Sequence, residues 1–146
     1  MSQKGISTQH KRQEDLIGRL KEAQKKFGYV PREVMAELAE SLDIALNEVY
    51  GVASFYSLLS TRPLGRNVIR ICKSLPCYLK HSQTIIESVG KEIGIDPGET
   101  TPDAKFSFQL TNCIGLCDRA PAMLINNDAH VDLTPEKISQ ILKVYK

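Results

Sequence analysis

Cys72-Lys-Ser-Leu-Pro-Cys77 and Cys113-Ile-Gly-Leu-Cys117 contain all four cysteines of this 146-residue chain. Each pair follows an apolar run that is typical of a β-strand. Thiolates are soft metal ligands, so four of them in two clusters favour a metal or iron–sulfur site. We predict that Cys72, Cys77, Cys113 and Cys117 bind a [2Fe–2S] cluster, which needs four thiolates converging on two irons.

The residues between the cysteines also fit such a site. Gly115 allows backbone N–H groups to approach a sulfur atom, and Pro76 stiffens the first loop. We expect the apolar side chains of Leu75, Ile114 and Leu116 to exclude water from the cluster.

Other uses of paired cysteines remain open at this point. Structural zinc sites usually have two residues between paired cysteines, although spacers of up to about four occur. Thiol–disulfide exchange normally uses a Cys-x-x-Cys motif, which this chain lacks. Four buried structural cysteines would have no need to cluster in pairs.

The composition is that of an ordinary globular protein. Hydrophobic residues make up 42% of the chain and charged residues 25%, which is enough for a core without disulfide bonds. A net charge of +2 gives no electrostatic argument for a nucleic-acid partner. The polar start does not read as a secretory signal, and no apolar run approaches the ~20 residues that cross a bilayer. We therefore expect a cytoplasmic protein without membrane insertion. In the reducing cytosol, paired cysteines more often serve metal or redox chemistry than structural disulfide bonds.

Catalytic motifs are not found in the sequence. It has no Gly-rich phosphate loop, paired-carboxylate site or nucleophile elbow. His10 falls in a polar start that we expect to be frayed, and His130 is expected to be exposed on a hairpin strand. His81 follows the first cysteine pair and is expected to be solvated rather than in contact with a cluster. We expect no active site in this chain itself.

The first part of the chain is predicted to be helical. Apolar residues at helical spacing predict a helix from about residue 9 to Phe27, and Gly28 is a stop signal. Pro31 suits the first position of a second helix. A third segment, residues 46–59, is rich in valine and aromatic residues, and Gly51 is expected to divide it into two short helices.

This helical part has a faint likeness to a helix-turn-helix. The segment 45–59 contains no Lys or Arg, so DNA binding is disfavoured. The turn at residues 61–65 predicts a boundary. We expect a helical region over residues 1–62 and a second domain over residues 66–146.

After Gly65 the hydrophobic period becomes that of strands. We predict strands at 67–71, 105–110, 122–125 and 129–132, and helices at 82–93 and from Pro135 onward, the last capped by Thr134. A strand–helix–strand unit followed by a hairpin and a closing helix predicts a small mixed sheet covered by helices. The fold class is therefore α+β, and the order of elements is compatible with a thioredoxin-like domain.

Together these features resemble the thioredoxin-like [2Fe–2S] ferredoxin family over nearly all of residues 28–146. Besides the cysteine pairs, the motifs that carry the resemblance are Gly28-Tyr-Val-Pro31, Val49-Tyr-Gly-Val-Ala-Ser-Phe-Tyr56, Arg62-Pro-Leu-Gly65, Gly98-Glu-Thr-Thr-Pro-Asp103, Phe106-Ser-Phe108, Ala120-Pro-Ala-Met123 and Leu133-Thr-Pro-Glu136. The combination is highly specific, whereas either cysteine pair alone is not. It is most similar to the small iron–sulfur subunits of respiratory complex I, NAD(P)-linked hydrogenases and formate dehydrogenases.

Two positions depart from the pattern of the family. The family usually has glycine where this chain has His81, and Asp-Gly where it has Asp103-Ala104. Neither position is a predicted ligand, so the departures concern local loop geometry and not the cluster.

The resemblance implies that the helical region, residues 1–62, packs on a flavoprotein partner. That partner would carry FMN, the NAD(P)H site and further iron–sulfur clusters, and the single cluster of this chain would exchange electrons near the flavin. The alternatives are a zinc-stabilised interaction module and a free-standing homodimeric ferredoxin. Among parent complexes, the short chain favours a soluble hydrogenase or formate dehydrogenase over complex I.

Overall fold

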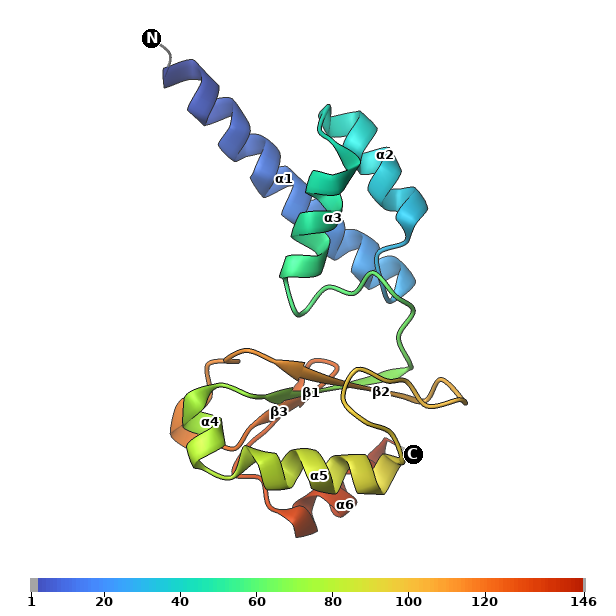
Figure 1. The fold of residues 1–146 in the computed structure, drawn as a ribbon, viewed down its shortest axis with the longest axis vertical. Helices are drawn as coiled ribbons and strands as arrows, with labels where there is room; N and C mark the ends of the chain where they lie inside the picture. Colours follow the sequence, from blue (N-terminus) through green and yellow to red (C-terminus); the bar gives the residue numbers. More distant parts are fainter. Residues whose placement is uncertain (1–2, 146) are drawn as a thin grey trace. The chain divides into compact units, whose positions relative to one another are not determined.

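The computed structural model describes the chain from Gln3 to Tyr145, with side chains described from Asp15 onward. It divides into two compact units, Met1–Pro63 and Leu64–Lys146. The elements in chain order are α1 (Gln3–Phe27), α2 (Arg32–Leu42), α3 (Leu46–Phe55), β1 (Asn67–Cys72), α4 (Leu75–Leu79), α5 (Ser82–Ile93), β2 (Phe106–Thr111), the 3-10 turn η1 (Cys117–Arg119), β3 (Met123–Ile125), β4 (Asp128–His130) and α6 (Pro135–Val144) (Figure 1).

The first unit is held together by one apolar stripe on α1. Leu16, Leu20 and Ala23 recur every three or four residues and are buried, as expected of a helix with one packed face. The residues of α2 and α3 that pack against this stripe are Met35, Leu38, Ala39, Leu42, Val49 and Ala53. The segment after α3 closes the unit, because the Val30 N–H donates to the Ser60 carbonyl at 2.7 Å.

Several expectations for this unit are corrected. Residues 3–8 belong to α1 and are not a coil before it, whereas residues 1 and 2 lie outside the described part of the chain. Pro31 is the N-cap of α2 and not its first helical residue. α3 continues through Gly51 and ends at Phe55. A glycine costs a helix only about 0.5–1 kcal/mol, and the burial of Val49 and Ala53 outweighs that cost. Among the described helices, even the 25-residue α1 is not apolar enough to cross a membrane.

The second unit is a four-stranded sheet in the order β2-β1-β3-β4. β1 is parallel to β2 and antiparallel to β3, and β3 and β4 form an antiparallel hairpin. A parallel pair needs a crossover connection, which α4 and α5 supply. β1 lies inside the sheet, and all six of its residues are buried.

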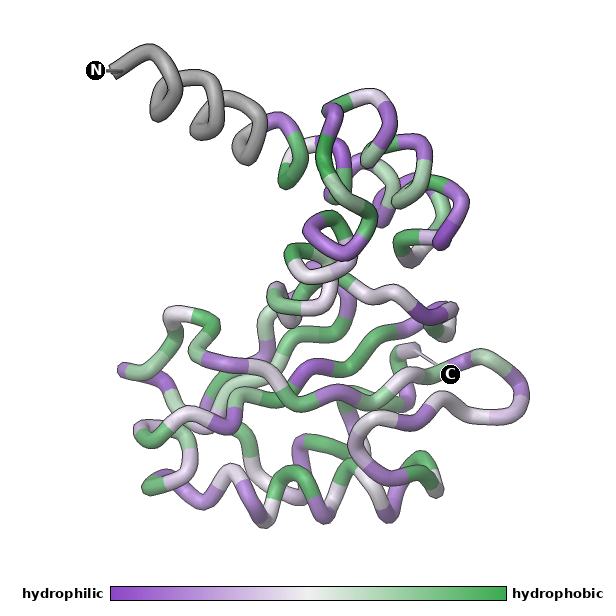
Figure 2. Tube along the Cα trace, turned by 45° about the horizontal axis from the view of Figure 1, so that its top comes forward, coloured by the Kyte–Doolittle hydropathy of each residue, from purple (hydrophilic) through white to green (hydrophobic). Residues whose placement is uncertain are grey.

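The core of this unit lies between the sheet and two helices. α5 and α6 cover one face of the sheet (Figure 1). Ile69 and Ile71 of β1 face this layer, where the buried apolar side chains of α5 and α6 are Ile85, Val89, Ile138 and Leu142. Polar and apolar residues are interleaved along α5 (Figure 2), as expected of a helix with one buried face. Because side chains alternate along a strand, Arg70 and Cys72 lie on the opposite face of β1.

The predicted order of elements in this unit is confirmed, with α4 and η1 added. α5 covers residues 82–93 as predicted, and the Thr134 hydroxyl accepts a hydrogen bond from the Lys137 N–H at the start of α6. β4 ends at His130 and not at residue 132, because Asp132 leaves the extended conformation with a φ of 49°. Ser107 of β2 is buried, and its Oγ accepts a hydrogen bond from the Gly65 N–H at 2.7 Å.

Both positions at which the family usually has glycine have a positive φ in this chain. The angle is 65° at His81 and 53° at Ala104, a region in which an L-residue with a Cβ is strained. We expect Ala104→Gly to raise the free energy of unfolding by about 0.5–1 kcal/mol net, after the larger chain entropy of glycine is deducted. Chemical denaturation measures this change. Ala129→Gly, in the exposed part of β4, is the control and should lower stability; the same sign for both variants would contradict the prediction.

Candidate metal centre

The first cysteine pair lies where β1 leaves the sheet. Cys72 is the last residue of β1, and Cys77 lies in α4. The Cys72 N–H donates to the Ala122 carbonyl at 3.3 Å and the Lys73 N–H to the Thr111 carbonyl at 2.9 Å. Pro76 is in the first turn of α4, where its missing N–H costs nothing. Both thiols are buried, with Cys72 exposed by 1% and Cys77 by 2%.

The second pair lies in the loop that follows β2, and both of its cysteines are exposed. The Sγ atoms of Cys113 and Cys117 are 3.2 Å apart. Gly115, with a φ of 81°, turns its N–H toward the Cys113 Sγ at 3.3 Å. The glycine therefore has the role expected from the sequence, which is to bring a backbone donor to a sulfur atom.

The topology brings the two pairs to one edge of the sheet. β1 and β2 are parallel, and Cys72 is in register with Thr111, so both loops leave the sheet at the same end. Electrostatic repulsion between the two cysteine pairs also affects the pKa values of their thiols. Burial raises the pKa of Cys77 to about 11, and repulsion from Cys72 and Cys117 adds to this rise. The pKa of Cys117 is raised first by its hydrogen bond with Cys113, and the charge of Cys72 adds to the effect.

The donor set fits a binuclear cluster. All four cysteines are free thiols. Among the described residues, no group of three or more His, Cys, Asp or Glu side chains lies close enough together to hold a single metal ion. Two thiol pairs at one edge correspond to two irons with two protein ligands each.

Water exclusion by the neighbouring apolar residues is only partly as predicted. Ile114 and Leu116 are half-buried, but Leu75 is 67% exposed. α4 is too short to have a second buried face and turns Cys77 inward. Leu75, Tyr78 and Leu79 therefore point to solvent, and the expectation for Leu75 was wrong.

Of the histidine side chains that the structure describes, neither His81 nor His130 is grouped with the cysteines. His81 is exposed, as expected. His130 is half-buried and not exposed; its Nε2 lies 3.2 Å from the Tyr145 hydroxyl, and burial lowers its pKa. The side chain of His10 lies outside the described side chains.

Arg119 and Asp132, for which the sequence showed no motif, form an ion pair beside the second cysteine pair. The Arg119 guanidinium donates to Asp132 Oδ2 from Nε at 2.9 Å and from Nη2 at 2.7 Å. The two residues are thirteen positions apart in the sequence, with the β3–β4 hairpin between them, so no local pattern could have predicted their contact.

Alkylation of the metal-free protein should begin at Cys113. Its thiol is exposed, and the Gly115 N–H lowers its pKa, whereas burial raises the pKa of Cys77 to about 11. The thiolate is the nucleophile, and each pKa unit changes its population about tenfold. At about pH 8 we expect iodoacetamide to modify Cys113 at least ~10-fold faster than Cys77, as measured by peptide mass spectrometry. In urea the two rates should converge; equal rates in the folded protein would contradict the prediction.

Comparison with known proteins gives consistent matches. The family model described as thioredoxin-like [2Fe-2S] ferredoxin matches residues 2–146. The E subunit of NADH-quinone oxidoreductase from Escherichia coli (strain K12) is 42% identical over 130 residues, which are 89% of this chain and 78% of that protein. The protein of the same name from Pseudomonas aeruginosa is 38% identical over 129 residues, 88% of this chain and 78% of that protein.

A solved structure is also similar. The crystal structure of NAD+-reducing [NiFe]-hydrogenase in the air-oxidized state includes a chain that superposes with a TM-score of 0.73 at 26% identity. The match covers 88% of this chain but only 22% of the hydrogenase chain.

Proposed function

The chain belongs to the thioredoxin-like [2Fe–2S] ferredoxin family, and from this premise we propose that it is an electron-transfer subunit of an NAD(P)H-linked oxidoreductase. It carries one [2Fe–2S] cluster and exchanges single electrons with a partner subunit that holds FMN and the NAD(P) site. When bound, the cluster takes up and releases one electron at a time. The substrate chemistry belongs to the partner.

The observation that carries this proposal is the meeting of two free thiol pairs at one edge of the sheet. We propose Cys72, Cys77, Cys113 and Cys117 as the cluster ligands. The parallel register of β1 and β2 supports this assignment, because it fixes where both loops start. The N–H of Gly115 supplies a hydrogen bond to a ligand sulfur, and such bonds tune the reduction potential of a cluster.

The proposed parent complex is of the NADH–quinone oxidoreductase type. Relatives with this name reach 42% identity, whereas the hydrogenase chain reaches 26%. This assignment departs from the preference for a hydrogenase or formate dehydrogenase that the length of the chain suggested. A cytoplasmic location is part of the same proposal.

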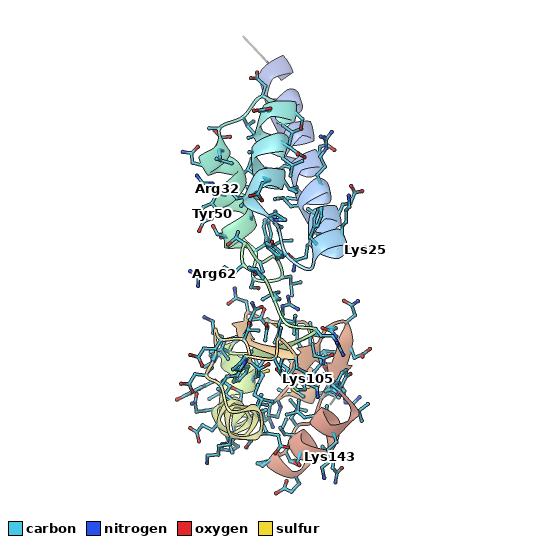
Figure 3. The ribbon with its side chains drawn as sticks, turned by 90° about the vertical axis from the view of Figure 1, so that its right-hand side faces the viewer. Lys25, Arg32, Tyr50, Arg62, Lys105 and Lys143 are labelled. Atoms are coloured by element: carbon cyan, nitrogen blue, oxygen red, sulfur yellow. The ribbon has the colours of Figure 1, made fainter. Side chains whose placement is uncertain are left out.

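We further propose that the helical region docks on the flavoprotein. Apolar side chains of α3 and the segment after it are exposed, with Tyr50 at 52%, Phe55 at 79% and Leu58 at 54%. Clustered exposed apolar residues mark interaction surfaces. A groove of about 630 Å³ includes Tyr50 in its lining, between the labelled Arg32 and Arg62 (Figure 3).

The first experiment is metal analysis after anaerobic purification. The protein should be reddish-brown and contain about two irons and two acid-labile sulfides per chain. Dithionite should produce the electron paramagnetic resonance signal of a reduced [2Fe–2S] cluster. A colourless protein with one zinc per chain would overturn the proposal in favour of a zinc-stabilised module.

The second experiment concerns the partner. The chain is co-expressed with the FMN-containing NADH dehydrogenase subunit of the same genome, and the two should co-purify. NADH should bleach the visible absorption of the cluster in the complex but not in the isolated chain. A homodimer that carries the cluster but neither binds the flavoprotein nor is reduced through it would indicate a free-standing ferredoxin instead.

A further inference from the structure

A hydrogen-bond network centred on Asp132 connects the β4–α6 segment to the second cysteine loop. The Asp132 carboxylate accepts two hydrogen bonds from the Arg119 guanidinium, at 2.7 and 2.9 Å. The Asp132 N–H donates to the Arg119 carbonyl at 2.9 Å. The Asp132 carbonyl in turn accepts a hydrogen bond from Lys137 Nζ at 2.8 Å.

This network holds the turn that presents Cys117. Arg119 is the last residue of η1, whose first residue is Cys117. The Arg119 N–H donates to the Leu116 carbonyl at 3.1 Å, so this bond links the residues on the two sides of Cys117. The Leu133 N–H continues the contact by donating to the Pro121 carbonyl at 3.2 Å. The Cys117 turn is therefore fixed from the β4–α6 segment by both backbone and side-chain bonds.

The geometry of Asp132 indicates that the network has a local purpose. Its φ of 49° lies in the left-handed region, which aspartate adopts more readily than most residues with a Cβ. The side chains of Arg119 and Asp132 are 59% and 47% exposed, and exposed ion pairs add little to global stability.

We propose that Asp132, acting through Arg119, is a positioning residue for the cluster ligand Cys117. It holds η1, and with it the Cys117 thiol, in place, and without it the bound cluster is released faster. The inference rests on the proposed function, and it adds to that function a residue pair outside the four ligands.

The test measures loss of the cluster from the purified holoprotein. Wild type, Asp132→Asn, Arg119→Gln and the double variant are mixed with an iron chelator, and the decay of cluster absorption is followed. Each single variant should release the cluster about two- to fivefold faster, the range expected from an exposed ion pair. The visible circular dichroism of the bound cluster should change in both. The double variant should release the cluster no faster than either single variant, because both remove the same interaction.

Two further variants separate positioning from stability. Asp132→Gly keeps the backbone N–H and accommodates a φ of 49° without strain, so the metal-free protein should unfold at or above the wild-type temperature while cluster release is still accelerated. Asp128→Asn removes another exposed carboxylate, which accepts a hydrogen bond from the Tyr145 hydroxyl, and should leave release unchanged.

Three outcomes would overturn the inference. These are wild-type release in Asp132→Gly, additive effects in the double variant, and equal acceleration in Asp128→Asn. Each is distinct from failure of the proposed function, which would appear earlier as a wild-type protein that contains no [2Fe–2S] cluster.

Discussion

Replacing Cys117 with alanine should remove nearly all iron from the purified protein and leave its fold intact. Four thiolates hold a [2Fe–2S] cluster, and the loss of one leaves an iron with an incomplete ligand set. Because Cys117 is exposed, its thiol contributes no packing to the core. We expect less than about a tenth of the wild-type iron content, no visible absorption band and no paramagnetic signal after reduction. Iron and sulfide assays measure the loss, and far-ultraviolet circular dichroism verifies the fold.

Asn112→Ala is the matched control for this prediction. Asn112 is also exposed and lies in the same loop, immediately before Cys113. It should retain the full cluster. If Cys117→Ala keeps two irons and two sulfides with an unchanged spectrum, Cys117 is not a ligand and the assignment of all four cysteines fails.

The second large effect is expected from Gly65→Ala, which should destabilise the second unit by about 1–3 kcal/mol. A Cβ at this position would lie 2.9 Å from the Phe106 carbonyl carbon and 3.0 Å from the Ala104 oxygen. Both are backbone atoms, one in the turn before β2 and one in its first residue, so they cannot move aside as a flexible side chain would. Their displacement would also disturb the 2.7 Å hydrogen bond from the Gly65 N–H to Ser107. Chemical denaturation monitored by circular dichroism measures the loss.

Gly51→Ala provides the contrast. A Cβ at Gly51 would meet nothing within 4 Å, and the residue lies inside α3. Alanine is favoured over glycine in a helix by about 0.5–1 kcal/mol, so this variant should be neutral or more stable. If both variants behave alike, the close contact at Gly65 does not constrain the protein.

Long periodic segments allowed most of the second unit to be predicted. α5 and α6 have apolar residues at helical spacing, and Thr134 is a capping residue that can be recognised locally. α4 could not be predicted in this way, since five residues are too few to show a period and Pro76 suggests a loop. The first unit was less predictable because Gly51 suggests a break that tertiary packing overrides.

The ligand set could be proposed from chemistry and spacing alone, but its surroundings could not. The loops that contain Cys72 and Cys113 start at the same end of the sheet because β1 and β2 are parallel neighbours. That pairing depends on contacts between residues far apart in the sequence. Leu75 is exposed because Cys77 occupies the one buried face of the short helix α4. The bond between Arg119 and Asp132 depends on a loop conformation with a positive φ, for which the sequence offers no signal.

The central position of β1 has a consequence for the protein as it emerges from the ribosome. β1 pairs with β2 on one side and with Met123–Ile125 on the other, so the sheet is incomplete until most of the chain has been synthesised. The first unit is complete once Pro63 has been added, and domains generally fold in order of synthesis. Until translation has passed β3, Cys72 and Cys77 lack the neighbours that bury them. The nascent chain is therefore a folded helical unit followed by a sheet that is completed last.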